Sequence, residues 1–248
     1  MGAFNILASL VHEVVGTLDA MNATSRASAL REFDALLEGE TFPCFAGRTA
    51  HRRHLIEHVF ASALACPADD ESLAERIESF AVCNSPEDTF RSLVVHFTDH
   101  AVIPEPVFER LLFARLQGIH EADARSHDWD PAVSNDPEDP AFSMSVGGRA
   151  FYVVGLHPGA SRPGRRLAHP ALVFNLHSQF EYLRSQGRYD RLKSAIINED
   201  IERNGSANPM LAVHGSTSEA VQYSGRHVEG SWSCPFSPVA QPNPRKTA

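Results

Sequence analysis

A predicted β-hairpin constrains the fold of this chain more than any other feature. The stretch "FSMSVGGRAFYVVGLH" (142–157) alternates apolar and polar residues up to Gly147 and Gly148, and an apolar run follows this glycine pair. Alternation of this kind on both sides of a Gly-Gly turn is typical of two antiparallel strands. A further short strand is predicted at "PALVFN" (170–175). The chain therefore needs a sheet with antiparallel pairing.

Most of the remaining chain has the spacing of amphipathic helices, with apolar residues three and four positions apart. Helices are predicted at 6–21, 24–37, 49–65, 71–80, 105–125, 177–186 and 188–203. A buried strand is predicted at "RSLVVHF" (91–97), and a loop at "ETFPCFAGRTA" (40–50). Strands and helices do not alternate strictly, which favours an α+β fold: a single domain (1–232) with a mixed or antiparallel sheet flanked by helices. The Pro-rich residues 233–248 are predicted to form an extended or disordered tail.

The composition excludes several classes of function. The 248 residues carry a formal net charge of −9, and 43% of them are hydrophobic. A net negative charge argues against binding to nucleic acid or to an anionic membrane, because both bind preferentially to basic surfaces. No apolar run approaches the ~20 residues that cross a bilayer. The four scattered cysteines suggest neither a disulfide framework nor a structural zinc site, so we expect a cytoplasmic protein.

The basic residues nevertheless gather in one place, in "LHPGASRPGRR" (156–166). His157 ends a predicted strand and begins a Gly/Pro turn, a position from which side chains often point into a site. Its imidazole could bind a metal or haem iron, or act as an acid or base. Ser161, Arg162, Arg165 and Arg166 follow, and arginine forks bind carboxylate or phosphate with two parallel bonds. A haem with its propionates and a phosphorylated substrate suit this segment equally, and a solvated basic turn is the simpler alternative.

Other polar residues are weaker candidates for a functional role. His177 stands at the start of a predicted helix, where a structural role is slightly favoured, and His120 is expected in the core. Asp128 and Asp130 could grip a cationic group such as a guanidinium, although turn chemistry explains them as well. Cys44 and Cys234 each lie beside a proline, and nothing near either one indicates an activated thiolate. The common nucleotide-binding, zinc-protease and α/β-hydrolase motifs are missing from the sequence.

Eight motifs taken together resemble one family. In order, they are "FPCFAGR" (42–48), "LQGIHEAD" (116–123), "HDWDPAVSNDP" (127–137), "VGLHPGASRPGRR" (154–166), "PALVFNLHSQFEYLR" (170–184), "NGSANPML" (204–211), "SEAVQYSGR" (218–226) and "WSCPF" (232–236). This series is similar to the YqcI/YcgG family over nearly the whole chain. The branch it resembles contains haem-dependent N-hydroxylases of natural-product pathways, among them the pre-guanitoxin N-hydroxylase and the arginine N-hydroxylase of D-cycloserine biosynthesis.

The resemblance implies a haem b monooxygenase that hydroxylates a guanidine or amine nitrogen of an arginine-like amino acid. His157 would be the axial iron ligand, with His177, His120 and His214 as alternatives, and the arginines 162, 165 and 166 would meet the propionates. Asp128, Asp130 or Glu219 would hold the substrate nitrogen, and Arg226 its carboxylate. O2 and an external electron donor are implied partners, because the sequence has no flavin or nicotinamide motif.

Two alternative functions stay open. The chain could carry or sense haem without catalysis. It could instead use residues 161–166, called the arginine turn below, for a carboxylate or phosphate without any haem. A homodimer is also compatible with the sequence.

Overall fold

The computed structural model describes residues 23–98, 101–208, 216–228, 230 and 232–239. The predicted helix at 6–21 and the ligand candidate His214 lie outside the described residues. A first described helix covers residues 23–38. The elements after it are α2 (Phe45–Arg52), β1 (Ile56–Ala61), η1 (Pro67–Asp69), α3 (Asp70–Cys83), β2 (Ser92–Phe97), α4 (Glu105–Asp123), β3 (Met144–Val146), β4 (Arg149–Leu156), η2 (Pro163–Arg165), β5 (Ala171–Leu176), α5 (His177–Ser185), α6 (Tyr189–Asn204) and η3 (Glu219–Gln222), where η denotes a short 3₁₀ helix.

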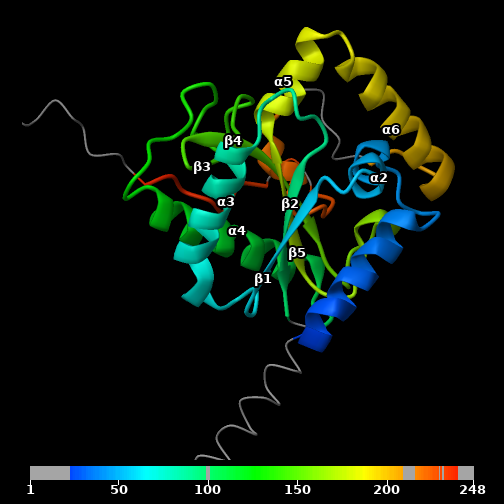
Figure 1. Ribbon diagram of the computed structural model, residues 1–248, viewed down its shortest axis with the longest axis horizontal. Coiled ribbons are helices and arrows are strands. Elements are labelled where there is room, and N and C mark those ends of the chain that lie inside the picture. Colours follow the sequence, from blue (N-terminus) through cyan, green and yellow to red (C-terminus); the bar gives the residue numbers. More distant parts are fainter. Residues whose placement is uncertain (1–22, 99–100, 209–215, 229, 231, 240–248) are drawn as a thin grey trace, which may run out of the picture.

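The described strands form one mixed sheet in the order β1-β2-β5-β4-β3. Strands β1 and β2 are parallel, and the other neighbours are antiparallel. Helices α3 and α4 cover one face of this sheet, and the helix at 23–38, α2, α5 and α6 lie on the other side (Figure 1). The predicted α+β class, with a single mixed sheet flanked by helices, is confirmed.

The face of the sheet toward α3 and α4 carries the main hydrophobic core. Val95 of β2, Val153 of β4 and Phe174 of β5 are buried there with Phe108 and Leu112 of α4. Strand β4 approaches α4 closely at Gly155, where a Cβ atom would come within 2.7 Å of side-chain atoms of both Phe108 and Leu112. A residue without a side chain is therefore required where β4 passes α4.

The opposite face of the sheet packs more loosely. Leu156 and Val94 lie with Phe33 and Leu37 of the helix at 23–38 in a second, smaller cluster. Because side chains alternate between the two faces of a strand, β1, β2, β4 and β5 each contribute to both clusters.

Two predictions about residues 40–65 are wrong. The predicted loop at 40–50 contains α2, whose N-cap is Cys44, with its Sγ accepting a hydrogen bond from the backbone N–H of Gly47 at 3.4 Å. The predicted helix at 49–65 is replaced by the end of α2 and the strand β1. In β1, Ile56 and the residues two and four positions on share one face and pair with β2, so tertiary pairing overrides the helical spacing of this segment. The predicted strands β2 and β5, the β3–β4 hairpin and the helices α3, α4, α5 and α6 are confirmed within a few residues.

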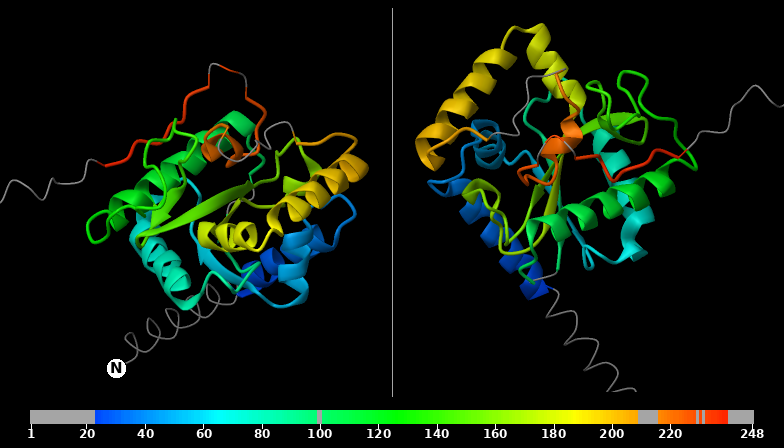
Figure 2. Two further views of the ribbon diagram at one scale, coloured as in Figure 1. Left: turned by 90° about the horizontal axis from the view of Figure 1, so that it is seen from above. Right: turned by 180° about the vertical axis from the view of Figure 1, so that it is seen from behind.

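The C-terminal segment packs along α4 (Figure 2). Residues 232–239 contain no helix or strand, as expected of an extended segment, yet Phe236 is only 2% exposed and belongs to the main core. Glu109 of α4 accepts hydrogen bonds from Trp232 Nε1 at 3.2 Å and from Arg226 Nη2 at 2.6 Å. The backbone N–H of Val239 donates to Nε2 of His120 at 3.0 Å. Packing of the domain therefore continues past residue 232.

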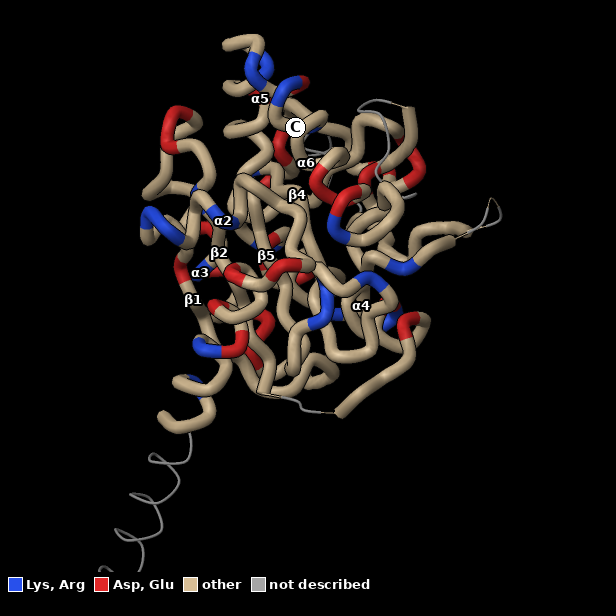
Figure 3. The backbone as a smooth tube through the Cα atoms, turned by 90° about the vertical axis from the view of Figure 1, so that its right-hand side faces the viewer, with Lys and Arg blue, Asp and Glu red and all other residues tan. Residues whose placement is uncertain are grey.

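Charge is distributed without a basic face on the side of the molecule shown in Figure 3, where acidic and basic positions are interspersed along the backbone. Within the described ranges, no helix combines the length and apolar character needed to cross a membrane.

We predict that Phe236→Ala lowers the free energy of unfolding by about 3–5 kcal/mol, because it leaves a cavity between α4 and the loop at 124–143. Val239→Ala is the matched control: this side chain is 41% exposed, and the substitution keeps the backbone bond to His120. Urea unfolding of both variants measures the difference. Equal stability of the two would contradict the packing of the C-terminal segment.

Candidate functional site

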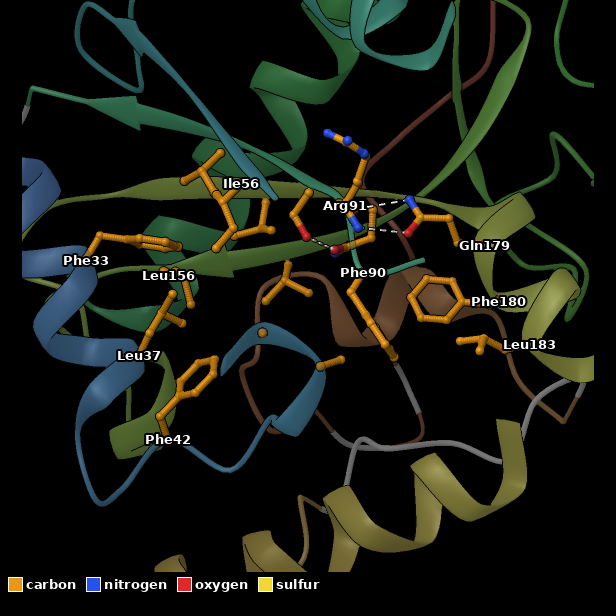
Figure 4. Close-up of a pocket in the computed structure, with 17 residues that line it drawn as sticks. Phe33, Leu37, Phe42, Ile56, Phe90, Arg91, Leu156, Gln179, Phe180 and Leu183 are labelled. Carbon is orange, nitrogen blue, oxygen red and sulfur yellow. Dashed lines mark hydrogen bonds between the residues drawn. The ribbon is translucent and has the colours of Figure 1, made fainter. Parts of the chain in front are cut away.

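An apolar pocket opens on the looser face of the sheet. Its walls come from the helix at 23–38, α2, α5 and the strands β1, β2, β4 and β5, and it holds about 720 Å³ of empty space when its open mouth is included. Phe33, Leu37 and Phe42 form one side, and Phe90 and Phe180 lie opposite (Figure 4).

The polar residues that line the pocket form two hydrogen-bonded pairs, and in one of them Oγ of Ser92 donates to Oδ1 of Asn175 at 2.7 Å. The backbone N–H of Arg91 donates to Oε1 of Gln179 at 3.0 Å, and Nε2 of Gln179 donates to the Arg91 carbonyl at 3.1 Å. The guanidinium of Arg91 points away from Phe42 and Leu37 (Figure 4). The lining residues include no carboxylate, so the pocket wall suits a flat apolar ligand better than a cationic one.

Three imidazoles form a hydrogen-bonded row on the same face of the sheet. Nδ1 of His58 on β1 lies 2.9 Å from Nε2 of His96 on β2, and Nδ1 of His96 lies 2.8 Å from Nε2 of His169, just before β5. The row ends on Glu32, whose Oε2 lies 3.1 Å from Nδ1 of His169. Among the described residues no three His, Cys, Asp or Glu side chains are grouped to hold a metal ion, so this row is a chain of hydrogen bonds rather than a chelating site.

The row adjoins the pocket through Phe33. The Phe33 ring meets the rings of His58 and His96 edge-on, with centroids 5.5 Å apart in both contacts. Desolvation by burial, with neighbouring imidazoles adding to it, lowers the pKa of His96 to about 3. Desolvation also lowers the pKa of His58, against the field of Asp34. These two imidazoles are therefore neutral at pH 7.

The residues of the arginine turn form hydrogen bonds with other parts of the chain. Each predicted anion-binding residue has an internal partner: Ser161 N with Glu105 Oε1 (2.8 Å), Arg162 Nη2 with Asp200 Oδ2 (2.7 Å), Arg165 Nη1 with the Tyr223 carbonyl (3.1 Å) and Arg166 Nε with the Ala160 carbonyl (3.1 Å). The turn also lies at the edge of the pocket, because a Cβ atom on Gly164 would come within 2.7 Å of Pro43, the neighbour of Phe42.

His157 lies on the other side of the sheet. Its ring stacks on Phe108 of α4 with centroids 4.0 Å apart, and the residue is 1% exposed. Neither ring nitrogen has a hydrogen-bond partner among the described residues. Burial lowers the pKa of His157 to about 4. The structure therefore gives His157 a neutral imidazole with both nitrogens unpaired, on the face opposite the pocket.

The alternative histidines are also distant from His157. His177 begins α5 at the far end of β5, where its Nε2 lies 3.6 Å from Glu181. His120 is in the core, as predicted, between Trp129 and Phe236.

The four predicted substrate-binding residues do not come together. The carboxylate of Asp130 accepts bonds from the backbone N–H groups of Ala132 and Ala150, which ties the loop to β4. Asp128 is exposed in the same loop. Arg226 forms a two-pronged ion pair with Glu109 and faces α4.

Glu219 has a different environment from the other three. Its Oε1 accepts hydrogen bonds from Ser143 Oγ at 2.5 Å and from Tyr223 Oη at 2.9 Å. Desolvation outweighs these bonds and raises the pKa of Glu219 to about 7. The residue can therefore exchange a proton near neutral pH, although it is not part of the pocket lining.

Sequence reasoning missed the histidine row and the pocket. The signal for the row was the alternation of Ile56, His58 and Phe60, together with His96 in a predicted strand. Reading 49–65 as a helix removed His58 from the sheet, and the pairing of β1 with β2 is a long-range contact that local spacing does not encode.

We predict that Cys66 and Cys83 react with iodoacetamide at neutral pH before Cys44 and Cys234. Burial raises the pKa of the Cys44 thiol and raises that of Cys234 to about 12, whereas hydrogen bonds lower the pKa of Cys66, and Cys83 is exposed. Peptide mapping by mass spectrometry gives the order of labelling. Early labelling of Cys44 or Cys234 would contradict the structural role of these thiols.

Acid destabilisation gives a further prediction. The folded state holds His157 neutral down to about pH 4, whereas the unfolded chain protonates it near its ordinary value of 6.5. Its contribution to stability is therefore complete above pH 6.5 and is lost as the pH falls toward 4, on the order of 3 kcal/mol in all. Without haem, His157→Phe should lose less stability than the parent chain between pH 7 and pH 4.5 in urea unfolding. An equal loss in both proteins would be inconsistent with a buried neutral His157.

Comparison with known proteins gives one match. The model of the YqcI/YcgG family matches residues 33–237, which include the pocket, the histidine row beyond Glu32 and the arginine turn. No match was found among curated proteins or among solved structures. The family model spans most of the chain, and the chain therefore belongs to the YqcI/YcgG family.

Proposed function

We propose that this chain is a haem-dependent monooxygenase that hydroxylates a guanidine or amine nitrogen of an arginine-like amino acid. The observation that carries the proposal is the apolar pocket next to a row of hydrogen-bonded imidazoles, in a member of the YqcI/YcgG family. The motifs of the chain resemble the haem-dependent branch of that family. When bound, the haem would supply O2 activation with electrons from an external donor.

The residues at the pocket fit a haem in two respects. The walls are apolar and aromatic, as a porphyrin face requires, and an imidazole that can bind iron lies beside them. His58 is the better placed imidazole. It does not line the pocket, but it lies on the same face of β1 as Ile56, which does. Its Nδ1 lies 2.9 Å from Nε2 of His96, and its Nε2 has no hydrogen bond to a described residue. Iron-binding histidines usually show this pattern, with one nitrogen held by an outer partner and the other directed at the metal.

His157, the ligand predicted from the sequence, remains a second hypothesis. Its unpaired nitrogens are suited to a metal, but the stacked ring of Phe108 covers it and the sheet separates it from the pocket. The geometry therefore favours His58.

The other predicted roles follow from the same placement. The arginine turn at the pocket edge would meet the propionates, which requires Arg162 or Arg166 to exchange its present partner for a carboxylate. The apolar walls would exclude water from the reacting nitrogen. Asp128, Asp130, Glu219 and Arg226 stay candidates for substrate binding, and their separation in the structure gives no support to a single anchor made from all four.

Haem titration of the purified protein tests the proposal. We expect a Soret band that is lost or strongly shifted in His58→Ala and retained in His157→Phe. The opposite pattern would assign the iron to His157, and failure of the parent protein to bind haem would contradict the proposal. Ala46→Trp, which fills the pocket, should also abolish binding, whereas Ala195→Trp on an exposed part of α6 should not.

Catalysis needs a separate measurement. The haem-loaded protein, a reductant, O2 and a panel of guanidino amino acids should give a product heavier by one oxygen atom. Haem binding without any such product would favour a haem carrier or sensor.

A further inference from the structure

Helix α6 packs on the domain without a buried apolar face. The structure describes every residue of this helix, and the only buried one is a carboxylate, Asp200. Its apolar residues Leu192, Ile196 and Ile197 are only partly buried, and Ile201 is exposed. Most helices of globular proteins are stabilised by packing an apolar stripe on the core, as α4 does along most of its length. This source of stability is weak in α6.

Charged and polar groups hold the C-terminal half of α6 instead. Oδ2 of Asp200 accepts a hydrogen bond from Nη2 of Arg162 in the arginine turn at 2.7 Å. Oε1 of Glu199 accepts one from Nη2 of Arg48 on α2 at 2.6 Å. The loop before α2 adds two backbone carbonyls, which accept bonds from the last turn of the helix: Glu40 from Arg203 Nη1, and Thr41 from Asn204 Nδ2.

Glycines connect both ends of α6 to the chain. Gly187 lies between α5 and α6 with φ +63°, and Gly205 follows α6 with φ +75°. A Cβ atom at either position would have no neighbour within 4 Å, so neither connection is packed against the domain. Glycine adopts many backbone conformations at low cost. The helix can therefore turn on these two positions when its polar contacts break.

The same helix joins two walls of the apolar pocket. Helix α5, which precedes it, contributes Phe180 and Leu183 to the pocket lining, and α2, which Arg48 ties to it, contributes Ala46 and Gly47. None of the described lining residues belongs to α6, which runs from the side of Leu183 toward the side of α2 (Figure 4). Movement of α6 would therefore leave the pocket lining intact.

We propose that α6 is a strap across the pocket, held closed by its ion pairs and opening on Gly187 and Gly205 to admit a ligand. Ion pairs that keep some contact with solvent contribute little stability compared with apolar packing. Opening of α6 thus costs less free energy than opening of the core helices. The opening serves the entry of any ligand and does not depend on haem.

Hydrogen exchange of the full chain without ligand tests whether α6 opens separately from the rest of the domain. We expect the backbone amides of α6 to exchange at least about tenfold faster than those of α4, because α4 is released only by unfolding of the core. Equal protection of the two helices would overturn the proposal.

A cysteine in the pocket wall reports directly on access. Leu183 lines the pocket and is 2% exposed, so Leu183→Cys should react slowly with iodoacetamide while α6 is closed. Adding Arg48→Met removes the ion pair between α2 and α6, and we expect labelling to become about threefold faster. Arg52→Met is the matched control, because it removes an exposed arginine of the same helix. Unchanged labelling with Arg48→Met would overturn the proposal.

A second pair of variants acts from α6 itself and keeps the test valid if Arg48→Met does not fold. Asp200→Ala removes the bond to Arg162, and we expect the labelling of Leu183→Cys to rise at least about tenfold. Glu202→Ala, at an exposed position of α6, should leave the rate unchanged. Exchange of the α4 amides is followed in every variant and should stay constant. Equal acceleration of α4 would show that the whole domain unfolds to admit the reagent, which would overturn the strap.

Discussion

The alternation of side chains along the central strands is the constraint on which the rest of this structure depends. Strand β2 sends Leu93, Val95 and Phe97 to the core under α3 and α4, while Val94 and His96 face the opposite side. Strand β4 divides its residues in the same way. A single sheet thus separates a tightly packed face, which provides stability, from a looser face with space for a ligand. A shift of one residue in register would exchange the two sets and place imidazoles in the hydrophobic core.

The same constraint places the chemistry. The histidines of β1 and β2 lie on neighbouring strands and on one face, close enough for their rings to bond directly. His169 extends the row at the start of β5, where the chain returns from the arginine turn. The pocket, the row and the turn, which are far apart in sequence, therefore meet on one side of the sheet. His157, although it follows β4 immediately, turns to the other side and packs on α4.

Most of the fold could be predicted from local patterns, and most of the candidate site could not. The hairpin at Gly147–Gly148 and the helix α4 follow from spacing and turn chemistry that operate within a few residues. The strand β1 could not be recognised in this way, because its apolar residues also fit a helix and its pairing with β2 depends on residues more than thirty positions away. Because residues 49–65 are predicted to form a helix, the sequence does not indicate that His58 lies beside His96 on a neighbouring strand. The arginine turn was recognised as a cation cluster, but its internal partners, such as Asp200 on α6, become visible only in three dimensions.

We propose that haem binds on the pocket face, with its iron at His58. The most direct measurement is a crystal structure of the haem-loaded protein with anomalous diffraction data collected at the iron edge. We predict one strong iron peak within bonding distance of Nε2 of His58, with the porphyrin between Phe33 and Phe180. An iron peak beside His157 on the α4 face, or haem bound away from both histidines, would contradict this account.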